Sequence, residues 1–296
     1  MNIKEISIFT LLCLCLVLKG QDNKKQIPVG SAFWGTHLVD RQTAITVPKG
    51  KLQLEILHRF GTIENGFSDL LGVYATSNIS MGISYGINKR LDARFFTQKF
   101  HKVQELGVKY RILQQSTDNR MPFSLSFYSA ISVDGRDKAM FGDTYRFSKR
   151  LYYQNELIIA RQFNYKFNVQ ASLAYVHMNT VDDKRQADNY DINLAVGYKI
   201  ARNKSVFASY QQPGNITWID DNSIAEFKPE AALSFGFESY TRTHNFQLFF
   251  TTRDKISLGK DLVYNINPIA LKNLRIGFNI RVKLFSGDKQ KHKQQS

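Results

Sequence analysis

The chain has 296 residues, with 40 Lys and Arg against 25 Asp and Glu, and 43% of its residues are hydrophobic. This composition excludes an intrinsically disordered chain, and a mean hydropathy of −0.31 excludes a bundle of membrane-spanning helices. It does not exclude a transmembrane β-barrel, because each strand of such a barrel has only one apolar face.

The first twenty residues have the pattern of a secretory signal peptide. Lys4 precedes an apolar run over residues 6–18, which is too short to cross a bilayer as a helix. We expect cleavage after Gly20, with an N-terminal anchor helix as the less favoured alternative. Cys13 and Cys15 are the two cysteines of the chain, so the mature protein is expected to have no disulfide and no thiolate ligand.

The next segment, residues 21–50, precedes the first alternating pattern. We expect it to lie in the periplasm or to enter a barrel lumen as a plug, led by Phe33, Trp34 and Gly35. From Lys51 onward, apolar and polar residues alternate with a period of two, as in strands with one apolar face. In the last segment, for example, Ile276, Phe278 and Ile280 share one face.

Twelve segments show this alternation and predict an all-β fold, a transmembrane antiparallel up-and-down β-barrel of about 12 strands over residues 51–285. Most are close to the length that a tilted strand needs to cross a bilayer. The predicted strands cover residues 51–60, 78–87, 91–100, 104–115, 122–134, 150–163, 166–178, 188–200, 204–212, 230–241, 244–252 and 273–285.

The connections between these segments are an independent test of the barrel. Short and long connections should alternate, because outer-membrane barrels have short periplasmic turns and longer outer loops. They do so at every position except near His101, where a short connection replaces a long one. A soluble β-sandwich is the alternative, but its strands average about 5–6 residues. Tyrosines at the predicted strand ends also favour interfacial girdles.

The last strand and the residues after it complete the barrel interpretation. Arg275, Gly277, Ile280 and Val282 form a pattern that resembles the signal by which the barrel-assembly machinery recognises a final strand. Residues 286–296 are a polar, basic tail. The expected location is therefore the outer membrane, with its lipid and the assembly machinery as partners.

Several blocks together resemble a known family. They cover residues 48–52, 58–61, 77–87, 109–116, 156–161, 175–179 and 244–248. In this order they resemble domain-of-unknown-function family 5777, predicted outer-membrane β-barrels of Gram-negative bacteria. The resemblance implies a barrel and a location, and no activity. The family usually has a second histidine where this chain has Phe249, which argues against paired-histidine chemistry here.

The inward face of the barrel should carry any selectivity. Its charges are mixed in sign, which argues against a wide anion pore. We expect them either to pair across the lumen and hold a narrow barrel together or to line a narrow or gated conduit for an unidentified small solute. The lumen-lining candidates are Glu55, Arg59, Glu105, Lys109, Arg111, Glu156, Asp191, Glu238, Arg275 and Arg281.

The period-two alternation assigns three histidines to the outward face of the barrel. His58 and His177 are expected at the outer rim, and His244 at the inner one. We expect interfacial positions for them and no metal site or other cofactor. An outer-membrane lipid hydrolase using His177 is the enzymatic alternative, although the neighbouring residues lack the serine and glycine of such enzymes.

A structural or surface-interaction barrel remains the other alternative. Its binding surfaces would be the outer loops at residues 61–77, 212–229 and 253–272, with Trp218 beside Asp220 and Asp221 as the main exposed contact. Paired aspartates there and at residues 182–183 lack a spaced calcium loop. Basic residues are spread along the chain, so nucleic acid is not an expected partner.

Overall fold

The computed structural model describes residues 33–216 and 227–284. The predicted signal peptide, residues 21–32, the loop residues Trp218, Asp220 and Asp221, and the polar tail lie outside the described residues. No helix in the described part of the chain is long and apolar enough to cross a membrane.

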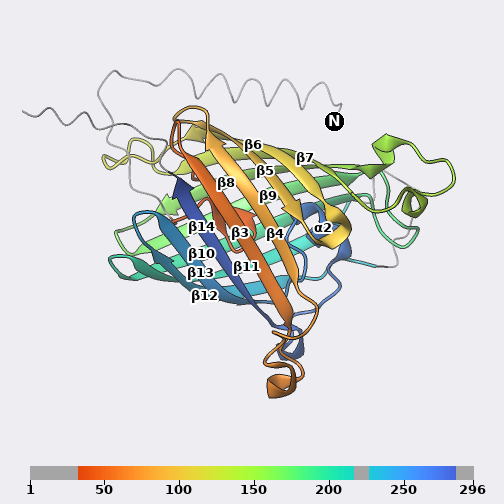
Figure 1. Cartoon of the computed structure of the whole chain (residues 1–296). Coiled ribbons are helices and arrows are strands. Elements are labelled where there is room, and N and C mark those ends of the chain that lie inside the picture. Colours follow the sequence, from red (N-terminus) through yellow and green to blue (C-terminus); the bar gives the residue numbers. More distant parts are fainter. Residues whose placement is uncertain (1–32, 217–226, 285–296) are drawn as a thin grey trace, which may run out of the picture.

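Twelve antiparallel strands close into one barrel (Figure 1). Each strand pairs with its neighbours in sequence, and the last closes the ring against the first, which confirms the predicted up-and-down barrel. In chain order they are β3 (Leu52–Thr62), β4 (Asn78–Gly86), β5 (Leu91–Gln98), β6 (Gln104–Leu113), β7 (Ser124–Val133), β8 (Leu151–Gln162), β9 (Phe167–Met178), β10 (Asp188–Ala201), β11 (Lys204–Asn215), β12 (Ala232–Tyr240), β13 (His244–Thr251) and β14 (Arg275–Leu284).

The strand boundaries differ from the predicted ones by a few residues. The largest difference is at β11, which was expected to end at residue 212 and continues to Asn215. Pro213 and Gly214 are poor strand residues, but here they pair with Asp191 and Tyr190 of the long strand β10. The partner strand therefore extends β11 beyond the point that local propensity indicates.

The two faces of the wall differ in polarity as the alternation predicts. Leu194 and Leu248 face outward and are 51% and 58% exposed, as the lipid-contacting surface of a membrane barrel requires. Their neighbours Asn193 and Gln247 point inward and are 1% exposed. Polar side chains of this face are thus covered by other protein atoms inside the barrel.

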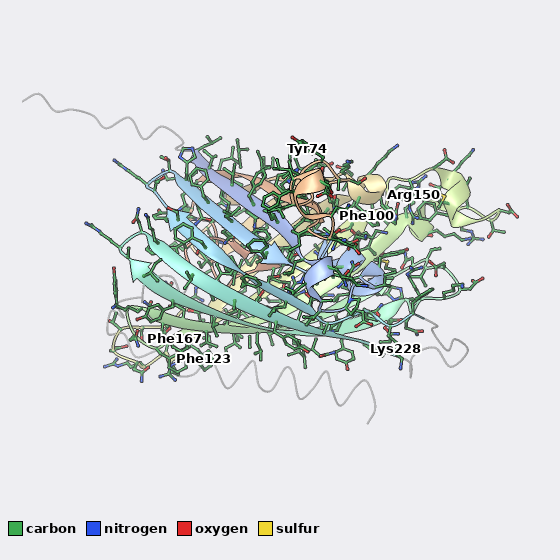
Figure 2. The ribbon with its side chains drawn as sticks, turned by 90° about the horizontal axis from the view of Figure 1, so that it is seen from below. Tyr74, Phe100, Phe123, Arg150, Phe167 and Lys228 are labelled. Atoms are coloured by element: carbon green, nitrogen blue, oxygen red, sulfur yellow. The ribbon has the colours of Figure 1, made fainter. Side chains whose placement is uncertain are left out.

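The two ends of the barrel also differ. Figure 2 shows Tyr74, Phe100 and Arg150 at the end that carries the long loops, whereas Phe123 and Phe167 lie at the opposite end. The connections at the long-loop end contain short 3₁₀ turns: η1 (Gly66–Asp69), η2 (Phe100–Lys102, in the short connection around His101), η3 (Lys138–Phe141), η4 (Phe147–Arg150) and η5 (Leu271–Asn273). The long-loop end is the outer one, because outer-membrane barrels have short turns on the periplasmic side.

Two further elements are not part of the wall. A small hairpin of two two-residue strands, β1 (His37–Leu38) and β2 (Arg41–Gln42), precedes the barrel. The helix α2 (Leu258–Tyr264) follows β13. In Figure 1, α2 lies within the outline of the barrel near its loop end.

Candidate functional site

The lumen holds residues 33–50, which we call the inner segment. Phe33 and Leu38 pack with Phe207 and Phe249 of the wall in one buried cluster. Val39 is fully buried at the tip of the β1–β2 hairpin, with a left-handed φ of 59° that lets the chain reverse there. Because these contacts come from separate strands, the inner segment lies inside the ring of strands.

Arg41 is the most strongly paired charge of the inner segment. Its Nη2 lies 2.6 Å from a carboxylate oxygen of Asp191 and 3.2 Å from one of Glu156. All three side chains are at most 2% exposed. A buried guanidinium between two carboxylates compensates charges that would otherwise be costly to desolvate.

Lys109 binds the backbone of the inner segment. Its Nζ donates hydrogen bonds to the carbonyl oxygens of Thr36 and Thr43, at 3.2 and 3.0 Å, and to Gln42 Oε1 at 3.1 Å. Lysine has three donors, and here each has an acceptor within the inner segment. Lys109 therefore fixes both sides of the hairpin to β6.

A third group of contacts surrounds His37. Its Nδ1 lies 2.7 Å from Glu55 Oε2, and Arg281 Nε donates to the same oxygen at 3.2 Å. Arg281 also donates to the backbone oxygen of His37. Ser84 completes the group by donating to Glu55 Oε1 at 2.8 Å. Glu55 of β3 and Arg281 of β14 thus contact each other directly, and His37 of the inner segment contacts both.

The outer half of the lumen holds residues 252–265, which we call the inner loop. Leu258, Leu262 and Val263 of α2 pack in one buried cluster with wall residues that include Tyr152 and Val176. Leu262 is fully buried. Gly259 is required in this packing, because a Cβ atom there would overlap the Tyr152 ring.

Polar contacts of α2 supplement this packing. Lys260 Nζ lies 2.6 Å from Asp134 Oδ2, and Gln211 donates to Asp261 Oδ2 at 2.9 Å. Burial lowers the pKa of Lys260 to about 8, although the Asp134 carboxylate favours the charged form.

The position of the inner loop corrects one expectation from the sequence. Residues 253–272 were expected to form an exposed binding surface, but most of residues 253–265 are buried inside the barrel. Apolar side chains at positions 258 and 262, one helical turn apart, favour burial over solvent exposure. Within residues 253–272, the large apolar side chains that are exposed are Ile266, Ile269 and Leu271.

An ion pair joins the two inner elements. Arg253 of the inner loop pairs with Asp40 of the inner segment, and Asp40 also lies 3.6 Å from Arg59 Nη2 on β3. Beside this junction a cavity of about 30 Å³ is lined by His37, Asp40, Gln42 and residues of the wall and inner loop. It has room for only a few water molecules, at roughly 10–15 Å³ each by this measure.

The ten residues expected to line the lumen fall into two groups. Seven are at most 1% exposed, namely Glu55, Arg59, Lys109, Glu156, Asp191, Glu238 and Arg281. The other three are half-buried: Glu105, which accepts a hydrogen bond from Tyr128 at 2.7 Å, and Arg111 and Arg275, which donate to backbone oxygens near the strand ends.

Wall charges pair with one another in part, as the pairing alternative expects: Arg281 of β14 lies 3.2 Å from Glu55 of β3 and 3.8 Å from Glu238 of β12. Glu156, Asp191 and Lys109 are bound by the inner segment rather than by residues of the opposite wall. The residues that sequence reasoning missed are His37, Asp40 and Arg41, since nothing in a non-alternating stretch marks these three as partners of strand residues.

The family comparison agrees with this architecture. A family model described as a membrane bound beta barrel domain (DUF5777) matches residues 33–284, which includes the inner segment from Phe33 onward. The chain belongs to the DUF5777 family. No curated protein sequence matches this chain.

Solved structures that are similar to this DUF5777 barrel include a channel and two porins. The COG4313 outer membrane channel from Pseudomonas putida F1 is 13% identical, with a TM-score of 0.50, covering 81% of this chain and 97% of that one. The KdgM porin is 7% identical (TM-score 0.47, coverage 79% and 99%), and the NanC porin is 10% identical (TM-score 0.46, coverage 79% and 99%). Together with the family match, the likeness to the COG4313 structure shows the fold alone: the DUF5777 chain is an outer-membrane β-barrel.

The outward histidines of the DUF5777 barrel occupy different environments. His58 stacks on Phe278 with ring centroids 4.9 Å apart, and His244 stacks on Phe246 at 5.7 Å. His177 Nδ1 lies 2.8 Å from Asp188 Oδ1, and no serine hydroxyl hydrogen-bonds to His177 among the described residues. The described residues also contain no cluster of three or more side chains that could hold a metal ion.

Phe249 has a packing role in the DUF5777 barrel. The centroid of its ring lies 4.3 Å from the Arg59 guanidinium carbon, and its side chain belongs to the buried cluster that contains Phe33. Gly277 on the adjacent strand leaves the space for this ring, because a Cβ atom there would overlap it.

Proposed function

We propose that the protein is a gated conduit for a small solute, closed by the inner segment and the inner loop. The observation that carries this proposal is how the inner segment is held. Residues 33–47 form a hairpin that pairs only with itself among the described residues, and side chains bind it to the wall. Residues 33–47 can therefore leave the lumen without breaking a strand pairing of the barrel, while Lys49 and Gly50 stay bridged to Gly86 of β4.

The energetics of these contacts also suit a gate. Arg41 compensates Glu156 and Asp191 only while the lumen is closed. If the segment withdraws, water enters and solvates the freed carboxylates, so the loss of the buried ion pairs is partly offset. A wall strand has no such replacement for its backbone hydrogen bonds inside a bilayer.

Planar-bilayer recordings of the refolded protein test the proposal. The full chain is compared with a variant that lacks residues 33–48, and both are first checked for heat-modifiable gel migration as evidence of a closed barrel. We expect rare, brief openings for the full chain and long-lived openings for the deletion variant. Steady conductance by the full chain contradicts the gate, and no conductance by the folded deletion variant contradicts the conduit.

A surface-interaction barrel is the second candidate, favoured by the apolar loop between β3 and β4. Phe67 and Tyr74 of this loop are 85% and 77% exposed, which is unusual for large side chains without a partner. Loops on a rigid barrel are common binding surfaces. Replacing both residues by Ser should abolish partner capture from intact cells if this candidate is correct, with conductance unchanged.

The hydrolase alternative rests on the His177–Asp188 contact, which would orient the imidazole as in an acyl-transfer site. A lipid-turnover assay with purified protein compares the natural chain with His177→Ala. Equal turnover removes this alternative.

A further inference from the structure

The outer mouth of the barrel contains a basic pocket that is separate from the contacts of Arg41 and Lys109. Its volume is about 650 Å³, and its charged lining residues are Arg59, Lys99, Lys255, Arg275 and Asp254. Four cations and one carboxylate leave an excess of three positive charges, and the carboxylate, Asp254, is itself paired with Lys255. His101 also lines the pocket.

The cations of this pocket have donors to spare. Lys99 Nζ donates to the backbone oxygen of Ser77 at 3.0 Å, and Arg275 Nη1 donates to that of Asn273 at 3.0 Å. Neither side chain is in an ion pair among the described residues. A concave site lined by one sign of charge concentrates ligands of the opposite sign.

Arg59 connects the pocket to the inner segment. It is fully buried, and its Nε has no hydrogen-bond partner among the described residues. Its Nη2 lies 3.6 Å from an Asp40 carboxylate oxygen, beyond hydrogen-bonding distance. Guanidinium groups bind carboxylates and phosphates through two parallel N–H groups, and this pair of donors is unsatisfied.

We propose that this pocket binds a small soluble anion with at least two carboxylate or phosphate groups, and that the bound anion competes with Asp40 for Arg59. The proposal rests on the proposed function and names its solute class. Asp40 is the residue through which the inner segment contacts both Arg59 and Arg253. An anion on Arg59 therefore loosens the inner segment, and the solute promotes the opening of its own path.

A binding experiment tests the pocket. Inorganic pyrophosphate is titrated calorimetrically into the full barrel in lipopolysaccharide-free detergent micelles at constant ionic strength, with sucrose as the neutral comparison. Lys99→Gln/Arg275→Gln should weaken pyrophosphate binding by about tenfold or more, because two charge-assisted contacts are lost. The matched control Lys166→Gln/Arg202→Gln removes two cations from the periplasmic turns and should leave the affinity unchanged.

The coupling to the inner segment has its own readout. In a Trp218→Phe background Trp34 is the remaining tryptophan, and its ring stacks on Tyr240 with centroids 5.3 Å apart. Pyrophosphate should shift the Trp34 emission to longer wavelength as the segment becomes hydrated, and the pocket variant should need about tenfold more pyrophosphate. An unchanged spectrum at saturating pyrophosphate overturns the coupling.

Four results separate the possible failures. Equal pyrophosphate affinity of the natural chain and the pocket variant overturns the anion site. Lipopolysaccharide that copurifies with the natural chain and not with the pocket variant, without pyrophosphate binding, shows that the pocket holds a lipid phosphate and overturns the soluble-solute proposal. If the deletion variant conducts but the barrel does not bind pyrophosphate, the conduit proposal stands and only the anion proposal is rejected. If the barrel binds pyrophosphate but the deletion variant does not conduct, the conduit proposal itself is rejected.

Discussion

The inner segment and the inner loop both occupy the lumen and both combine apolar packing with buried polar contacts, but the polar contacts are the more numerous in the inner segment. The inner segment places Asp40 and Arg41 in buried ion pairs and hydrogen-bonds His37 to Glu55. The inner loop places three apolar side chains of α2 in one cluster with the wall. Charged contacts can be exchanged for water or a solute ion, whereas apolar packing has no such replacement.

This difference assigns separate roles to the two elements. The inner loop stays in place against strands β8 to β10 on one side of the outer half of the lumen, and the inner segment is the part that moves. The Arg253–Asp40 pair connects the stationary element to the mobile one. Four variants test this division of roles.

The largest effect is expected from Arg41→Gln. It leaves Asp191 and Glu156 buried without their partner, and breaking such an ion pair from one side costs about 3–5 kcal/mol. The inner segment should then be released, measured as a red shift of Trp34 emission in the Trp218→Phe background. Arg111→Gln, which removes a cation near the periplasmic turn, is the control, and an equal shift in both variants contradicts the role of Arg41.

Leu262→Ala should weaken the inner loop without releasing the inner segment. Truncation of a buried leucine costs about 2–5 kcal/mol, so the amides of α2 should exchange faster with deuterium. Leu271→Ala removes a leucine that is 79% exposed and should leave exchange unchanged. A Trp34 shift in Leu262→Ala would show that the two elements move together.

The inner loop should also respond to pH through Asp261. Burial raises the pKa of Asp261 from 3.8 to about 7, and the positive charge of Arg253 opposes this shift only in part, while Asp40 adds to it. In packed α2, Asp261 therefore retains a proton that it would release in an exposed loop. The protection of the α2 amides against deuterium exchange is thus greatest near pH 4 and decreases as the pH rises to about 7.

Deuterium exchange of α2, corrected for the intrinsic pH dependence of amides, measures this loss. In Asp261→Asn the protection should be independent of pH across the same range. Equal pH dependence in both proteins assigns the effect to another group.

The smallest effect is expected from Tyr240→Leu, which removes the stack on Trp34 at 5.3 Å and 18° between ring planes. Such pairs contribute about 0.5–1.5 kcal/mol beyond their buried area. We expect slightly longer channel openings in bilayer recordings than for the natural chain. Tyr198→Leu changes an outward tyrosine and should leave the open times unaltered.

The wall could be predicted from the sequence almost residue by residue. A bilayer demands apolar side chains outside and complete backbone pairing, and both demands leave a period-two pattern in each strand. The pattern failed where a partner strand extended its neighbour, as at Pro213 and Gly214 of β11. Local propensity carries no information about that partner.

The contents of the lumen could be predicted only in outline. Small side chains on the inward face, such as Ser80, Gly82 and Ser84, indicate space in the lumen, and residues 21–50 were one of the candidates to occupy it. Ser126 illustrates the limit: its hydroxyl donates to the backbone oxygen of Ala44, a contact between residues 82 positions apart. Nothing local to either residue specifies the other.

The sequence by itself therefore determined a twelve-stranded outer-membrane barrel and which face of each strand meets lipid, because those properties depend on the character of neighbouring side chains. Only the tertiary structure decided which charges pair, since Arg41 could neutralise any of several inward carboxylates. It also decided that part of an outer loop is buried, because α2 needs the apolar cavity that strands β8 to β10 create around it.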